Sequence, residues 1–108
     1  MPYDENLAER IRAVLGDRPG VMERKMFGGI AFMLHGNMFC GIVREDLMAR
    51  VGADAYDDAL AEPHARPMDF TGRPMKGMVY VGAPGIAGKG LQTWVDRTLA
   101  FVEKLPPK

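Results

Sequence analysis

Short apolar runs alternate with glycine-containing or acidic pairs over residues 21–51, and this pattern constrains the fold more than any other feature. The separating pairs are Gly28-Gly29, Gly36-Asn37 and Glu45-Asp46. Runs this short, bounded by residues that favour turns, predict consecutive β-strands joined by tight connections. We therefore expect an antiparallel meander with strands at residues 21–27, 30–35, 38–44 and 47–51.

Helical periodicity appears on both sides of this meander. Residues 4–15 begin with a capping Asp4 and place apolar side chains on one face, and residues 91–105 carry a longer apolar stripe. A shorter helix is predicted at residues 53–61. Between it and the last helix we expect an edge strand at 66–70, a turn at 71–74, a strand at 75–81 and a glycine-rich loop at 82–90.

The expected order is thus one helix, four strands, a helix, two strands and a helix. Sequential strands with short turns give an antiparallel sheet, and the fold class is α+β, with two layers in one domain over residues 1–108. The runs at residues 30–34 and 38–43 are apolar on both faces of their strands, which predicts cover on both sides. Either the helices divide between the faces, or a second subunit covers one.

Composition excludes several classes of protein. Fourteen basic residues balance fourteen acidic ones, so net charge gives no argument for nucleic acid. The single Cys40 cannot form an internal disulfide, and the N-terminus lacks the charged start and apolar run of a signal peptide. No apolar run approaches the length of a membrane span. We expect a cytoplasmic, bacterial protein with no membrane partner.

Gly28-Gly29 follows two basic residues and could suggest a phosphate-binding loop. Such a loop opens a helix, whose free amides meet the anion. Here a strand-like run follows instead, and the hairpin interpretation is favoured. Arg24, Lys25, Arg73 and Lys76 could still gather into an anion-binding patch if their strands are neighbours. The alternative is that each is a solvated charge or has an acidic partner.

Cys40 and His35 flank the second turn, but the pattern does not favour a catalytic or metal site. His64 is distant in sequence, and a zinc site usually needs four ligands, or three and a water. A cysteine in an apolar strand is more often a small core residue. We expect no catalytic residue, no metal and no cofactor, and keep an enzyme using Cys40 as an alternative.

Methionines are unusually frequent and gather in or beside the predicted strands. Methionine adapts to irregular cores and to binding surfaces, so an exposed methionine-rich sheet face would indicate an interaction surface. Core packing is the alternative for most of them. The methionines concerned are Met22, Met26, Met33, Met38, Met48, Met68, Met75 and Met78.

Three segments together resemble the N-terminal domain of the TfoX/Sxy family: RKMFGGIAFMLHGNMFCGIV, LMARVG and FTGRPMKGMVYV. The resemblance spans nearly the whole chain. It implies an α+β fold of the secretion-chaperone-like group, whose members often form dimers. Full-length members, which add a C-terminal helical domain, regulate natural competence, apparently by assisting a cyclic-AMP-responsive transcription factor. The family brings no established catalytic residues.

Our hypothesis from the sequence is a non-enzymatic regulatory or adaptor domain that acts through protein contacts. Its partner would be another protein or a second copy of the chain, as a homodimer. The alternative is a nucleic-acid-associated protein that uses Arg24, Lys25, Arg73 and Lys76.

Overall fold

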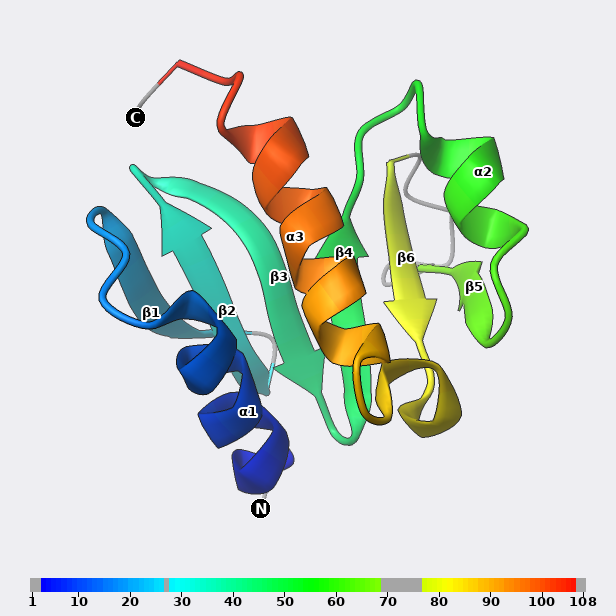
Figure 1. Cartoon of the computed structure of the whole chain (residues 1–108), viewed down its shortest axis with the longest axis horizontal. Coiled ribbons are helices and arrows are strands. Elements are labelled where there is room, and N and C mark those ends of the chain that lie inside the picture. The colour runs from blue at the N-terminus through cyan, green and yellow to red at the C-terminus, as the bar shows by residue number, and fades with distance from the viewer. Residues whose placement is uncertain (1–2, 27, 69–76, 107–108) are drawn as a thin grey trace.

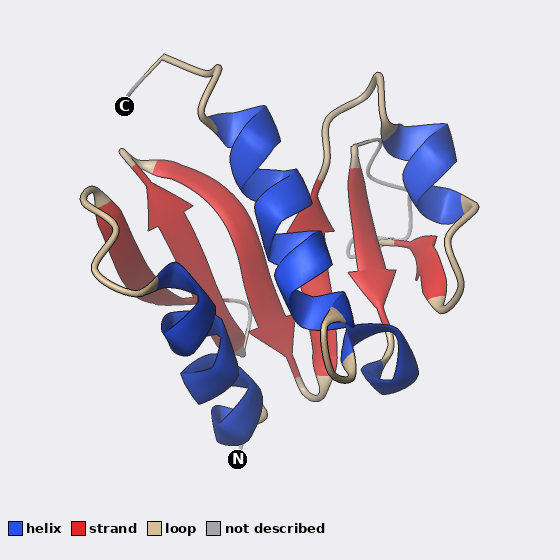
Figure 2. Cartoon of the chain, in the orientation of Figure 1, coloured by secondary structure: helices blue, strands red, loops and turns tan. Residues whose placement is uncertain are grey.

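The computed structural model of the chain describes residues 3–26, 28–68 and 77–106, with Met26 described in its backbone alone. Figures 1 and 2 show helices lying across a curved sheet. The elements in chain order are α1 (Glu5–Leu15), β1 (Val21–Met26), β2 (Gly29–Leu34), β3 (Asn37–Val43), β4 (Asp46–Arg50), α2 (Tyr56–Leu60), β5 (Ala65–Pro67), β6 (Met78–Val81), the 3-10 helix η1 (Ala83–Ile86) and α3 (Gly90–Val102).

The strands form one six-stranded sheet in the order β1-β2-β3-β4-β6-β5, and every neighbouring pair is antiparallel. The α+β fold class is confirmed. Strand β5 lies at one edge, where its Pro67 costs no ladder hydrogen bond, and β1 lies at the other. The chain order of the strands does not reveal that β6 inserts between β4 and β5.

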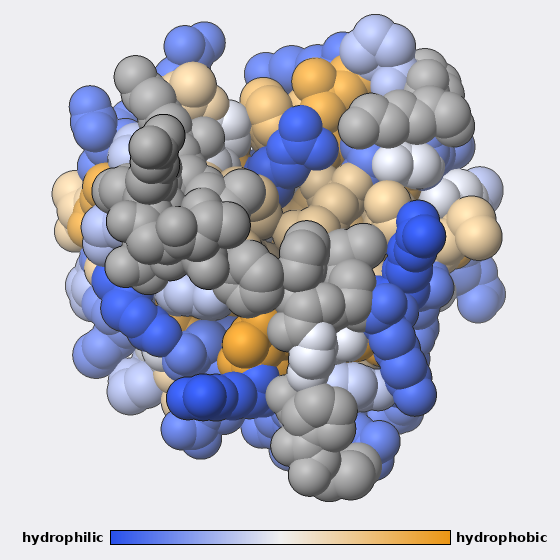
Figure 3. All heavy atoms as spheres, turned by 180° about the vertical axis from the view of Figure 1, so that it is seen from behind, coloured by the Kyte–Doolittle hydropathy of each residue, from blue (hydrophilic) through white to orange (hydrophobic). Residues whose placement is uncertain are grey.

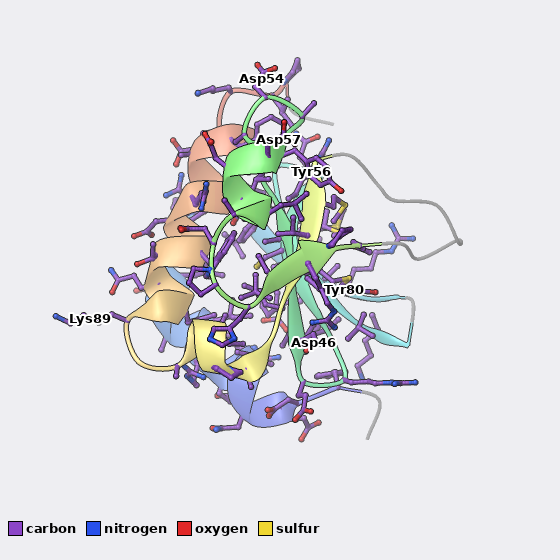
Figure 4. All side chains as sticks on the ribbon, turned by 90° about the vertical axis from the view of Figure 1, so that its right-hand side faces the viewer. Asp46, Asp54, Tyr56, Asp57, Tyr80 and Lys89 are labelled. Atoms are coloured by element: carbon purple, nitrogen blue, oxygen red, sulfur yellow. The ribbon has the colours of Figure 1, made fainter. Side chains whose placement is uncertain are left out.

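The helices share one face of the sheet. Helices α1 and α3 lie across β2, β3 and β4, while α2 packs beside β5 and β6 on the same side (Figures 1 and 4). Burial of apolar side chains between these two layers supplies most of the driving force for folding. The core joins buried residues from all three helices and from strands β2, β3, β4 and β6, among them Leu7, Ile11, Phe32, Cys40, Leu47, Tyr56, Val79, Val95 and Leu99.

The tight turns lie one residue earlier than predicted. The turn between β2 and β3 is His35-Gly36, with φ of 51° and 86°, and not Gly36-Asn37. A two-residue hairpin of this type needs positive φ at both central residues, which His35 adopts here. Asn37 instead begins β3, where its buried Nδ2 donates to the Pro106 carbonyl at 2.9 Å. The third turn is likewise Arg44-Glu45 and not Glu45-Asp46.

Other boundaries also differ. Helix α2 begins at Tyr56 and not at residue 53, and no side chain caps its N-terminus. Helix α3 ends at Val102, and the loop predicted at residues 82–90 contains η1. The turn predicted at residues 71–74 and parts of the strands predicted at 66–70 and 75–81 lie outside the described residues.

Helix α1 is tied to the sheet by its own cap and by an ion pair. Asp4 accepts a hydrogen bond from the Leu7 amide at 3.1 Å, as predicted for the cap. Further along the helix, Arg12 donates to both carboxylate oxygens of Glu23 on β1, each at 2.7 Å. Glu9 is a second partner of Arg12. The bidentate pair fixes the helix against the edge strand.

Substitution of Glu23→Gln should lower the free energy of unfolding by about 0.5 kcal/mol at pH 7, since the pair is partly exposed. Hydrogen bonding by Arg12 lowers the pKa of the Glu23 carboxyl. The stabilisation is therefore present above the unfolded carboxyl's pKa and is lost as pH falls through the lower folded pKa. Urea unfolding at several pH values measures this, with Glu45→Gln as control. A loss of unfolding free energy in Glu23→Gln, relative to wild type, that grows as pH falls would contradict this role of the Arg12–Glu23 pair.

Candidate interaction face

The face of the sheet opposite the helices is not covered by any described helix, and we call it the open face. Strand alternation assigns its members: Val21 packs on the core and Glu23 meets α1, so Met22 and Arg24 project the other way. The cross-strand register extends this assignment to the other strands. By this register, the described residues of the open face are Met22, Arg24, Ala31, Met33, Met38, Gly41, Val43, Asp46, Met48, Arg50, Arg66, Met78 and Tyr80.

Three methionines form a row at one end of the open face. Met22 pairs with Met33 across β1 and β2, and Met33 pairs with Met38 across β2 and β3. Side chains that pair in this way lie within contact distance. Met22 is 67% exposed, while Met33 and Met38 are half-buried. Figure 3 views the molecule from this side and shows apolar side chains at the surface among charged ones.

A second row crosses the whole sheet and has a different character. Its register is Arg24, Ala31, Gly41, Met48, Tyr80 and Arg66, from edge to edge. The middle of the row is buried: Ala31, Gly41 and Met48 have almost no exposed surface, and a β-carbon at Gly41 would stand 2.6 Å from the Met48 Cε. At the far edge Arg66 pairs with Asp46 at 2.5 Å and lies 5.0 Å from the centroid of the Tyr80 ring. Figure 4 shows Asp46 and Tyr80 at this end of the sheet.

The methionines of the sequence thus divide between two roles. Met48 and Met68 are buried, while Met22, Met33, Met38 and Met78 reach the surface of the open face. Met75 and the Met26 side chain lie outside the described residues. The turn positions fix that Met22, Met33 and Met38 form one row, and the turns predicted from the sequence would not give this pairing.

The structure separates the two described members of the predicted basic patch. Arg24 projects to the open face and Lys25 to the helix side, because adjacent residues of a strand alternate. Both are exposed, and neither has an ion-pair partner among the described residues. Glu23, the acidic residue next to Arg24 in the sequence, binds Arg12 instead. Arg73 and Lys76 lie outside the described residues.

Cys40 faces the helices and is fully buried in the core. Burial raises the pKa of its thiol, since a thiolate would lose its hydration there. His35 is exposed in the turn before β3, with its ring against Gly20. Within residues 3–26, 28–68 and 77–106, no group of three histidine, cysteine, aspartate or glutamate side chains could hold a metal ion.

We expect Cys40 to resist a water-soluble thiol reagent in the native protein. Reaction with Ellman's reagent should proceed only as fast as the core opens, because the reagent needs an accessible thiolate. The same chain in denaturant is the control and should react at once. Native labelling at the rate of a small-molecule thiol would revive the alternative of an enzyme that uses Cys40.

The Gly28-Gly29 pair lies where β1 connects to β2, and not at the N-terminus of a helix. Gly28 has a φ of 73°, which suits a tight connection between β1 and β2. Gly29 begins β2 and lies so close to β3 that a β-carbon would stand 1.9 Å from the Ile42 carbonyl oxygen. A strand follows this pair, so the helix amides that a phosphate loop requires are not supplied.

These features define an α+β domain with helices on one side of an antiparallel sheet and methionines on the other. The chain belongs to the TfoX N-terminal domain family, whose model matches residues 13–102. Neither a curated protein nor a solved structure matches the chain. Among the described helices, none combines the length and apolar character needed to cross a bilayer.

Proposed function

We propose that this chain is a non-enzymatic regulatory or adaptor domain of the bacterial cytoplasm that acts through protein contacts, in transcriptional regulation. Membership of the TfoX N-terminal domain family supports a regulatory role. The observation that carries the proposal is the row of Met22, Met33 and Met38 on the open face, with Met22 67% exposed.

Physical chemistry favours a protein as the occupant of this row. Thioether side chains are flexible and polarisable, so they adapt to a partner's shape. The row ends at β1, an edge strand whose Arg24 and Lys25 are charged and discourage unspecific strand pairing. The occupant is another protein or a second copy of this chain, which would then form a homodimer.

The experiment compares tagged wild type with Met22→Lys after purification from the native host, using quantitative mass spectrometry. Met22 is exposed, so a lysine there should leave the fold intact while placing a charge in the contact. We expect the recovery of at least one co-purifying protein, or of the untagged copy of this chain, to fall by about tenfold in Met22→Lys. Ala13→Lys, on exposed α1 surface, is the matched control. Identical recoveries from all three proteins would contradict the proposal.

The second candidate is a nucleic-acid-associated protein, favoured by Arg24 and Lys25, which are exposed and have no ion-pair partner within the described part of the chain. Phosphate contacts make affinity fall steeply with salt. If this candidate is correct, duplex DNA should bind with a marked salt dependence that Arg24→Gln and Lys25→Gln reduce. Binding that is absent at low salt, or insensitive to both substitutions, would exclude it.

A further inference from the structure

A groove of about 530 Å³ lies between the C-terminal half of α3 and the segment that joins β4 to α2, away from the open face. It exists because the residues that line it are small: Gly52, Ala53 and Ala55 on the connecting segment, and Ala100 on α3. Its size falls in the range of small-molecule sites, roughly 300–1,000 Å³. We call it the α3 groove.

The floor of the α3 groove is apolar and includes an aromatic ring. Phe101 is half-buried there, beside Val51. The Phe101 ring lies directly against the backbone of Gly52, where a β-carbon would stand 2.4 Å from a ring carbon. The floor therefore offers a flat aromatic and aliphatic surface to the apolar part of a ligand.

Positive charge surrounds this apolar floor. Arg97 stands on α3, three residues before Ala100, and Lys104 lies in the turn after α3, three residues after Phe101. Arg97 also pairs with Glu62 at 3.3 Å and lies 5.1 Å from the centroid of the Trp94 ring. Lys104 has no ion-pair partner among the described residues.

Two further charges complete the surroundings. The Arg50 guanidinium lies 5.6 Å from the centroid of the Phe101 ring, and its Nη1 donates to the Met38 carbonyl. Asp54 is the one acidic side chain that lines the groove within the described residues. Figure 4 shows Asp54 at the outer end of the segment that precedes α2. Two cations, Arg97 and Lys104, and one carboxylate, Asp54, therefore line the groove.

We infer that the α3 groove binds a small amphiphilic carboxylate. Its apolar body would lie on Phe101 and displace water from the floor, and its carboxylate would reach the ammonium group of Lys104. Small residues shape the cavity and the surrounding cations select the charge of the ligand. This inference is independent of the open face, since none of the residues that line the groove belongs to that face.

The experiment titrates decanoate, below its micelle concentration, into the purified chain and follows backbone amide resonances of residues 52–55 together with the heat of binding. Decanoate should shift these resonances, while decyltrimethylammonium, which carries the opposite charge, should not. Ala100→Trp fills the groove from an exposed helix position and should weaken binding by about tenfold or more. Lys104→Glu should weaken it while keeping the fold.

Ala13→Trp, on α1, is the matched control and should bind as the wild type does. If Ala100→Trp fails to fold by circular dichroism, Ala53→Trp replaces it from the opposite wall. Affinity unchanged in the groove-filling variant would overturn the inference. So would equal binding of the cationic probe, or loss of binding in Met22→Lys, which would place the probe on the open face.

Discussion

Substitution of Gly29→Ala should destabilise the protein by about 3 kcal/mol or more, because the new methyl group has no room. A β-carbon at Gly29 would stand 1.9 Å from the carbonyl oxygen of Ile42, which belongs to the backbone of β3 and cannot rotate away. Strands β2 and β3 would have to separate at their pairing. Against a total stability of about 5–15 kcal/mol, this is a large loss. Urea unfolding measures it.

Gly28→Ala is the matched control, one residue earlier. Nothing lies within 4 Å of a β-carbon there, so the cost is the strain of a positive φ alone, about 1–2 kcal/mol. The account predicts that Gly29→Ala is clearly the more damaging of the two. Equal losses of unfolding free energy in the two variants, or a larger loss in Gly28→Ala, would show that β2 and β3 do not approach as closely as described.

The second large effect concerns Phe32 and Met33, neighbours on β2 that project to opposite faces. Phe32 is fully buried in the core against the helices, so Phe32→Ala should cost about 3–5 kcal/mol. Met33 is half-buried on the open face, where the surface relaxes more easily. Met33→Ala should cost about 1 kcal/mol. Paired urea unfolding curves of the two variants give the comparison.

This pair tests which face the helices cover. If the helices lay on the other side of the sheet, Met33→Ala would be the costly substitution and Phe32→Ala the mild one. Equal costs at low protein concentration would mean that both faces are buried within a single chain.

The fold could be predicted from the sequence where local signals act alone. The Asp4 cap, the helix after it and the β1-β2-β3-β4 meander all follow from side chains close in sequence. The sequence predicts the turn between β2 and β3 at Gly36-Asn37 and not at His35-Gly36, because asparagine favours turns in general. In the structure, the side-chain amide of Asn37 donates a hydrogen bond to the carbonyl of Pro106, 69 residues away along the chain. Long-range contacts of this kind leave no local signal.

The sequence predicted that an interaction surface could exist, but it did not predict where on the sheet that surface lies. The abundance of methionine indicated an interaction surface, and hairpin register then selects Met22, Met33 and Met38 as one row. Which face the helices cover depends on how α1 and α3 pack, and sequence periodicity leaves that choice open. The α3 groove is built from small residues, Gly52 and Ala100 among them, and small residues alone do not distinguish a cavity from close packing.

The location of the open face also separates the proposed function from its alternatives. A protein contact needs the exposed end of the methionine row, while nucleic acid would need Arg24 and Lys25, and an enzyme would need Cys40. Met22 and Arg24 share the open face of β1, Lys25 projects to the helix side and Cys40 lies in the core, so each hypothesis names its own residues for substitution. The three hypotheses can therefore be tested independently in the same folded protein.

The most direct measurement of the central claim is photo-crosslinking from the open face in the native host. The photoreactive amino acid p-benzoylphenylalanine is placed at position 22 in one strain and at position 13, on the exposed side of α1, in another. The account predicts a defined protein adduct, with a partner or with a second copy, from position 22 and not from position 13. No adduct from position 22, or the same adducts from both positions, would contradict it.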